Sequence, residues 1–254
     1  MGKRRSSVLA SDNGEDLLES VYNSRKISTD TIFTKKQYGE ALLKKVHITC
    51  KNERQKQFLK SIDEKEITIC VGESGVGKSY LSIAKALDLL KDSSNGYDKI
   101  FIITPIVESE DSIGYLKGDL EQKSFPYLYS IYYLFDKIIG EDARKKLVES
   151  KIIEPLYISY LRGINIDHAI VVSDESQNMS IKGIKTLLTR IGDNSKFIIS
   201  GDLNQIDRFK KPEESGLKYV YDNLQSIPDI GFIQFEKGDI VRNPIISDIL
   251  ERFP

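Results

Sequence analysis

Cysteine and histidine are scarce in this chain of 254 residues, and their scarcity excludes several kinds of chemistry. The two cysteines, Cys50 and Cys70, cannot build a disulfide framework, which favours a reducing, cytoplasmic compartment. The two histidines, His47 and His168, have no acidic or cysteine partner at the spacing of metal ligands. No Ser-His-Asp or Cys-His pairing can be proposed, so we do not expect nucleophilic catalysis of that kind.

Long apolar runs are also missing. No stretch approaches the roughly 18 apolar residues that a membrane-spanning helix needs, so we expect no membrane partner. The first five residues, Met1 to Arg5, lack the apolar core of a secretory signal. Apolar residues make up 40% of the chain and charged residues 30%, a composition that predicts a folded globular core.

A net charge of -1 hides an uneven distribution along the chain. Residues 1–60 hold 13 Lys/Arg and 7 Asp/Glu, whereas the remaining residues hold 24 and 31. The basic arm could touch nucleic acid or an acidic partner surface, or it could be a solvated, partly disordered tail. The net charge by itself does not argue for nucleic-acid binding.

One short segment matches the phosphate-binding loop G-x-x-x-x-G-K-[ST] at every position. It runs Gly72-Glu73-Ser74-Gly75-Val76-Gly77-Lys78-Ser79, after an expected strand over 66–71 and before a helical pattern over 78–91. The glycines let backbone N–H groups turn toward phosphate oxygens, and the new helix adds the positive end of its dipole. We expect Lys78 to reach the β- and γ-phosphates and Ser79 to bind magnesium, with Tyr80 also in the site. The segment therefore predicts binding of a nucleoside triphosphate.

Adjacent carboxylates follow a second apolar run. Asp174 and Glu175 come directly after Val171-Val172-Ser173, where buried carboxylates are costly unless a cation or another partner meets them. We expect Asp174 to hold magnesium, directly or through water, and Glu175 to polarise the water that attacks the γ-phosphate. A surface turn that carries acids is the alternative, and the P-loop upstream favours the catalytic interpretation.

A third expected strand, over 196–200, leads to Gln205. Its amide could bond the γ-phosphate or the attacking water, because ligands bind at the carboxyl edge of parallel α/β sheets. Arg162, Arg190 and Arg242 are candidates for an arginine finger, which a neighbouring subunit could supply. Arg190 and Arg242 are the preferred pair.

Short apolar runs alternate with helical patterns along the rest of the chain. We expect further strands over 99–103, 168–173 and 230–235. The expected helices span 38–45, 53–62, 125–139, 181–191, 213–224 and 244–253. This alternation predicts an α/β fold with a mainly parallel sheet that helices cover on both faces.

The ordered set of motifs resembles the PhoH family of P-loop ATPases, whose core is similar to that of superfamily 1 helicases. Besides the P-loop, the resemblance rests on residues 105–120, 155–163, 173–178, 187–192, 200–207 and 239–244. It implies a RecA-like ATPase domain over 49–254 after a basic, partly disordered extension over 1–48. It also implies ATP with Mg²⁺, a homo-oligomeric ring with a hexamer as the candidate form, and an RNA or single-stranded DNA partner.

Some positions qualify the resemblance. Gln55 matches a glutamine that reads the adenine edge in helicase-like ATPases, although a surface position on the first helix is equally open. Thr104 stands where many relatives carry arginine, and Asn243 where histidine is usual. The favoured function is an RNA- or single-stranded DNA-dependent translocase or helicase. An ATP-gated protein-assembly factor and, less well supported, a small-molecule kinase are the alternatives.

Overall fold

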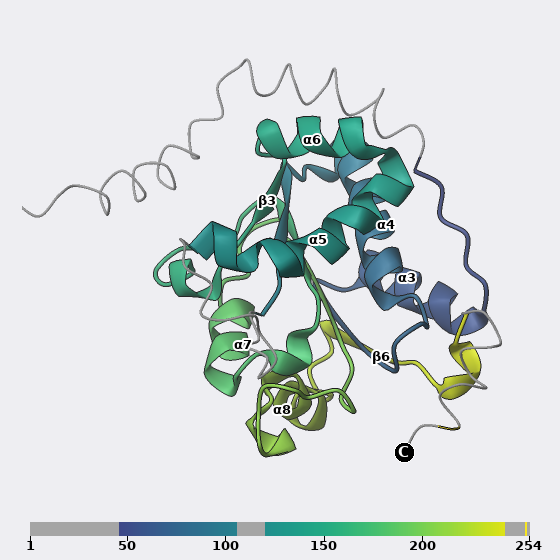
Figure 1. Ribbon diagram of the computed structural model, residues 1–254, viewed down its shortest axis with the longest axis vertical. Helices are drawn as coiled ribbons and strands as arrows, with labels where there is room; N and C mark the ends of the chain where they lie inside the picture. Colours follow the sequence, from purple (N-terminus) through teal and green to yellow (C-terminus); the bar gives the residue numbers. More distant parts are fainter. Residues whose placement is uncertain (1–45, 106–119, 242–251, 253–254) are drawn as a thin grey trace, which may run out of the picture. The chain divides into compact units, whose positions relative to one another are not determined.

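The computed structural model describes residues 46–105, 120–241 and 252 (Figure 1). All of them fall within one compact unit, Tyr38–Pro254. The basic extension, the helices expected over 38–45 and 244–253, and the positions Arg242 and Asn243 lie outside the described residues, apart from Val46 to Ile48 and Arg252. Within the described part, no helix is both long enough and apolar enough to cross a bilayer.

A six-stranded parallel sheet forms the centre of the described unit, which confirms the predicted α/β fold. The strands are β1 (Ile67–Val71), β2 (Lys99–Ile103), β3 (Ile153–Pro155), β4 (Ala169–Ser173), β5 (Lys196–Gly201) and β6 (Ile230–Gln234). They lie in the order β3-β2-β4-β5-β1-β6, and every pairing is parallel. Strands β1, β4 and β5 are buried throughout, which is why they appear in the sequence as nearly continuous apolar runs.

Helices cover both faces of this sheet (Figure 1). On one face, α3 (Glu53–Glu64), α4 (Lys78–Lys91), α5 (Leu120–Ile139) and α6 (Glu141–Glu149) bury side chains such as Phe58, Leu87 and Phe135. On the other face, α7 (Ile181–Leu188) and α8 (Gly216–Asn223) bury Ile184 and Leu217. Successive strand residues alternate between the two clusters, as side chains with a period of two must.

The carboxyl ends of the strands meet at one edge, and the strand order decides which loops meet there. Strand β5 lies between β1, which leads into the P-loop, and β4, which leads into the two carboxylates. The register pairs Val71 with Gly201 across β1 and β5, and Ser173 with Ile199 across β4 and β5. Three motifs that are far apart in the sequence therefore end side by side.

Two elements were not predicted. Strand β3 is only three residues long and ends in Pro155. Helix α6 follows Gly140, which has a φ of 89°, and buries only Ala143 and Leu147. Both have too few apolar residues for a clear period. They form because α6 packs on β3 and α5, which only the folded chain brings together.

Two helices are shorter than predicted, each for a local reason. Helix α7 stops at Leu188 because Ile191 pairs with Ile166 in a parallel bridge, with Ile166 N donating to Arg190 O at 2.8 Å. Helix α8 begins at Gly216, after a separate 3-10 turn over Pro212–Glu214, because Ser215 Oγ accepts the backbone N–H of Lys218 at 3.3 Å.

Candidate nucleotide-binding site

The predicted P-loop connects β1 to α4 in the expected order. Gly75 and Gly77 have φ values of 101° and 96°, a left-handed conformation that favours glycine. Gly72 N donates to Gly201 O at 3.2 Å and so joins the start of the loop to the end of β5. No side chain caps the N-terminus of α4, which leaves that end of the helix for an anionic ligand.

Lys78, the first residue of α4, folds back over the loop. Its side chain is buried, and Nζ donates to Gly72 O at 2.6 Å and to Glu73 O at 3.0 Å. These two carbonyl groups hold the ammonium group inside the concave side of the loop. A phosphate cradled by the backbone N–H groups would therefore meet a positive charge that is already positioned.

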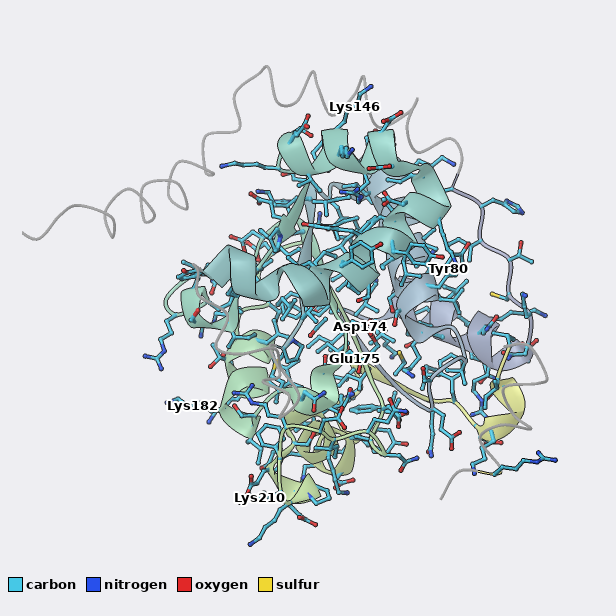
Figure 2. All side chains as sticks on the ribbon, viewed as in Figure 1. Tyr80, Lys146, Asp174, Glu175, Lys182 and Lys210 are labelled. Carbon is cyan, nitrogen blue, oxygen red and sulfur yellow. The ribbon has the colours of Figure 1, made fainter. Side chains whose placement is uncertain are left out.

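The two carboxylates at the end of β4 have different surroundings, and Figure 2 shows them close together near the middle of the molecule. Asp174 is buried, and its Oδ1 accepts a hydrogen bond from Ser200 Oγ on β5 at 2.7 Å. Glu175 has a φ of 53°, an uncommon left-handed conformation for a residue with a side chain. This backbone turn directs the chain from β4 into a short 3-10 turn over Ser176–Asn178.

Burial is the main electrostatic influence on Glu175. Desolvation raises the pKa of its carboxyl group, and the neighbouring charge of Asp174 adds to that effect. A hydrogen bond from Gln177 and the positive charge of Lys78 act in the opposite direction, while Asp202 raises the pKa further. A carboxylate in such surroundings binds a proton more readily than an exposed one, as a general base must.

Gln177, to which the sequence assigned no role, connects these groups. Its side chain is fully buried, and Nε2 donates to Glu175 Oε2 at 2.7 Å and to Gln205 O at 3.1 Å. Its Oε1 accepts the backbone N–H of Asp202 at 3.1 Å. One amide therefore ties the Glu175 carboxylate to the loop after β5, and the only sequence signal for Gln177 was its place in the family motif over 173–178.

A cavity of about 730 Å³ joins the three loops, a volume typical of a small-molecule site. Among the residues that line it are most of the predicted ligand-binding positions: Gln55, Ser74, Gly75, Gly77, Lys78, Ser79, Tyr80, Glu175 and Gln205. Asp202, His47, Thr49, Leu134, Lys137 and Val241 also line it and were not predicted. The predicted positions Gly72, Glu73, Val76 and Asp174 are not among the lining residues.

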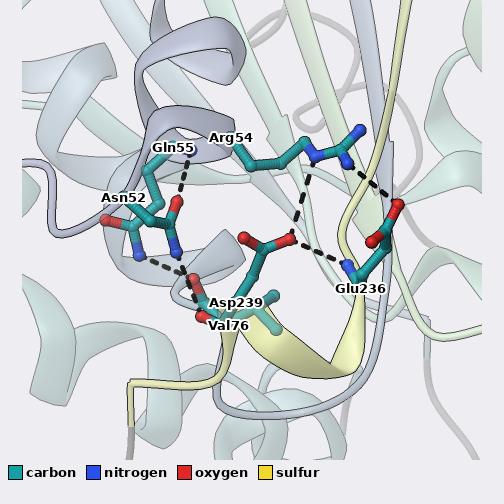
Figure 3. Close-up of polar contacts among 6 residues, drawn as sticks. All are labelled: Asn52, Arg54, Gln55, Val76, Glu236 and Asp239. Carbon is teal, nitrogen blue, oxygen red and sulfur yellow. Dashed lines mark hydrogen bonds and ion pairs between the residues drawn. The ribbon is translucent and has the colours of Figure 1, made fainter.

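Gln55 lies against the P-loop, which excludes the surface position left open by the sequence. It is 3% exposed, and its Nε2 donates to Val76 O at 2.8 Å (Figure 3). Its Oε1 accepts Lys51 N at 2.7 Å. A Cβ atom at Gly77 would lie 3.1 Å from Gln55 Nε2, so the glycine also admits this contact. Adenine recognition by Gln55 remains a prediction.

The segment before Arg242 is also held near the site by hydrogen bonds and an ion pair. Arg54 Nη2 bonds Glu236 Oε1 at 2.9 Å, and Asn52 Nδ2 donates to Asp239 O at 3.2 Å (Figure 3). Val241 N then donates to Gly75 O in the P-loop at 3.1 Å. The described chain therefore reaches the phosphate-binding loop one residue before Arg242, which itself lies outside the described residues.

Arg190 is not brought to the cavity of its own chain. It follows α7, where Nη1 donates to Ile164 O at 3.4 Å and Nη2 to Thr189 Oγ1 at 3.3 Å. Its backbone pairs with Ile166, which precedes β4, so Arg190 lies toward the amino ends of the strands. Any contact between Arg190 and a bound nucleotide would have to involve a second subunit.

The possible metal ligands near the P-loop are suited to Mg²⁺ rather than to a metal ion whose ligands all come from the protein. Ser79 offers a hydroxyl oxygen and Asp174 a carboxylate, and both are hard oxygen ligands. Among the residues that the structure describes, no group of three or more His, Cys, Asp or Glu side chains could hold a metal ion. Magnesium bound by one or two protein oxygens, phosphate oxygens and water is compatible with that donor set.

The P-loop, the acidic end of β4 and the strand β5 between them define the fold of the P-loop NTPase class, with a RecA-like strand order. The chain belongs to the PhoH-like family, whose model, described as "PhoH-like protein", matches residues 47–254.

Several curated relatives carry the same family name. A "PhoH-like protein" from Bacillus subtilis is 35% identical over 246 residues, 96% of this chain and 72% of that protein. A "PhoH-like protein" from Synechocystis is 32% identical over 88% of this chain and 65% of its own length. "Protein PhoH" from Escherichia coli strain K12 is 30% identical over 81% of this chain and 58% of its own length. The chain therefore matches only part of each relative.

Proposed function

We propose that this protein is a Mg²⁺-dependent ATPase whose hydrolysis is coupled to RNA or single-stranded DNA. The observation that carries the ATPase part is the common cavity lined by Lys78, Glu175 and Gln205. These residues come from three loops and supply a phosphate-binding cation, a general base and a sensor amide. Gln177 links the last two through bonds to Glu175 and to the backbone of Gln205.

The residues of the site suggest a direct hydrolysis step. Lys78 and the N-terminus of α4 bind the phosphates and offset their charge. Glu175 accepts one proton from a water molecule as the water oxygen bonds to the γ-phosphorus. The bond between that phosphorus and the β,γ-bridging oxygen breaks, and its electron pair leaves with ADP. Magnesium bound by Ser79 and Asp174 would neutralise charge on the phosphate oxygens.

Exposed basic side chains on the loop after β5 support a polyanionic partner. Arg208, Lys210 and Lys211 follow Gln205 within six residues and are exposed, as is Lys182 on α7. Figure 2 shows Lys182 and Lys210 pointing away from the ribbon on the side of α7 and α8. Hydrogen bonds connect this loop to the turn that follows Glu175, because Asn178 Oδ1 accepts the backbone N–H groups of Asp207 and Arg208 at 3.0 and 3.2 Å. Contact with a phosphate backbone could therefore be transmitted to Gln205 and Glu175.

Stimulation by nucleic acid tests this part of the proposal. We expect single-stranded RNA or DNA to raise the ATPase rate, less so as salt rises, because phosphate contacts release counterions. The double variant Lys210→Ala/Lys211→Ala should need several-fold more polymer for half-maximal stimulation while its rate without polymer stays unchanged. Hydrolysis should be measured at two salt concentrations with each polymer.

Lys146→Ala is the matched control, because Lys146 is exposed on α6 at the other end of the molecule (Figure 2). Its stimulation should match the wild type. A wild-type rate indifferent to both polymers would instead favour an ATP-gated protein-assembly factor. An equal loss in Lys146→Ala would show that general charge, rather than this loop, binds the polymer.

Subunit mixing tests whether an arginine acts between chains. Arg190→Ala and Lys78→Ala should each be inactive alone, and mixed oligomers should recover part of the activity if Arg190 reaches a neighbour's nucleotide. The same experiment with Arg242→Ala tests the other candidate. Absence of recovery in oligomers shown to be mixed would exclude the arginine concerned as a finger supplied in trans.

A further inference from the structure

Asp202, the residue after β5, has a carboxylate without a role in the hydrolysis step proposed above. It is 4% exposed, yet it is one of the residues that line the cavity. Its Oδ1 accepts the backbone N–H of Asn204 at 2.9 Å. Its Oδ2 is buried and has no hydrogen-bond partner within residues 46–105 and 120–241.

The backbone around Asp202 is held in place by Gln177. Asp202 N donates to Gln177 Oε1 at 3.1 Å, and a Cβ atom at Gly201 would lie 2.5 Å from the same oxygen. The bond from Asn204 then fixes the carboxylate itself by occupying one of its two oxygens. Asp202 therefore has little freedom to turn toward another donor of the protein.

A buried carboxylate oxygen without a donor is unfavourable, and folded chains retain one chiefly where a ligand or solvent donor completes it. A carboxylate with a purely structural role in this loop would be expected to use both oxygens within the protein. Glu175 lines the same cavity, and the charge of Asp202 contributes to raising the pKa of Glu175. Gln177 thus bonds the side chain of Glu175 and the backbone of Asp202, and both carboxylates line the cavity where the γ-phosphate and its attacking water are expected.

We propose that Asp202 is a second acceptor for the attacking water, an inference that rests on the ATPase function proposed above. Glu175 takes one proton of the water as its oxygen bonds to the γ-phosphorus. Asp202 Oδ2 accepts a hydrogen bond from the other O–H group, which stays on the phosphate product. No further reactant is needed, because Asp202 neither gains nor loses a proton in the step. Fixing the second hydrogen aligns a lone pair of the water oxygen with the phosphorus.

The test compares Asp202→Asn with Asp207→Asn, which changes an exposed carboxylate of the same loop. Three quantities are measured for each protein: kcat and KM for ATP, affinity for the Mg²⁺ complex of an imido analogue of ATP, and the midpoint of thermal unfolding. For Asp202→Asn we expect kcat to fall at least about tenfold, with KM and analogue affinity within about twofold of the wild type. The unfolding midpoint should stay equal or rise, because a neutral amide replaces an unpaired buried charge. Asp207→Asn should match the wild type throughout.

Two results would overturn the assignment of Asp202. One is a kcat within about twofold of the wild type. The other is a fall in kcat accompanied by a lower unfolding midpoint and weaker analogue binding, which would mark Asp202 as a support of the loop. Failure of the proposed function is distinguishable, because it appears in the wild type as the absence of any hydrolysis that depends on Lys78. In that case the inference about Asp202 fails with it.

Discussion

Replacing Lys78 with alanine should weaken ATP binding by roughly 10²–10⁴-fold and abolish measurable hydrolysis. The wild-type ammonium group is buried and fixed by two carbonyl oxygens of the P-loop. It is therefore preorganised to bind the phosphates and loses little conformational entropy when it does so. Each hydrogen bond to a charged phosphate is worth roughly 1.5–3 kcal/mol, and Lys78 is expected to make two. Loss of both accounts for the expected change in affinity.

Equilibrium binding of a fluorescent ATP analogue with Mg²⁺, together with steady-state phosphate release, checks this result. Lys91→Ala is a suitable control, because Lys91 is an exposed lysine at the other end of the same helix. Lys91→Ala should bind and hydrolyse as the wild type does. Unchanged nucleotide affinity in Lys78→Ala would show that the loop does not bind phosphate in the way proposed.

Replacing Glu175 with glutamine should have the opposite signature, with ATP retained and turnover lowered by about 10²–10⁴-fold. The amide cannot take a proton from water, whereas its carbonyl oxygen can still accept the 2.7 Å hydrogen bond that Gln177 donates to Glu175. The geometry of the site should therefore survive the change. Removal of a buried negative charge beside Asp174 should also leave nucleotide affinity equal or somewhat higher.

Single-turnover hydrolysis and analogue binding separate the two effects. Glu214→Gln, an exposed glutamate before α8, controls for the change of charge and should behave as the wild type. Turnover at the wild-type rate by Glu175→Gln would transfer the role of general base to another group, and Asp202 is a candidate because its carboxylate also lines the cavity. Loss of nucleotide binding by the same variant would mean that Glu175 supports the fold of the site.

Contrasting behaviour of these two variants would support separate roles for Lys78, in nucleotide binding, and for Glu175, in catalysis. Lys78 acts on the bound state, so its loss lowers affinity, while Glu175 acts on the transition state, so its loss lowers kcat.

The sequence by itself determined the parts of the site whose chemistry is local. The P-loop, the helix Lys78–Lys91 and the strand before them follow from residue spacing, because the glycines, the lysine and the helix start act within one short segment. The apolar runs of β1, β4 and β5 likewise indicated a parallel sheet, since buried strands need no polar face. Asp174 and Glu175 were recognisable because they interrupt such a run at its end.

Only the tertiary structure decided which distant groups meet at the edge of that sheet. Gln177 and Asp202 lie within the family motifs over 173–178 and 200–207, but the bond that joins the loops after β4 and β5 could not be read from either motif. Gln55 lies on the P-loop rather than at the surface because α3 packs beside β1. Arg190 lies away from the cavity of its own chain because α7 ends in a bridge to Ile166. The physical reason is common to all of these: packing and hydrogen bonds between segments far apart in sequence depend on strand order, which residue spacing does not encode.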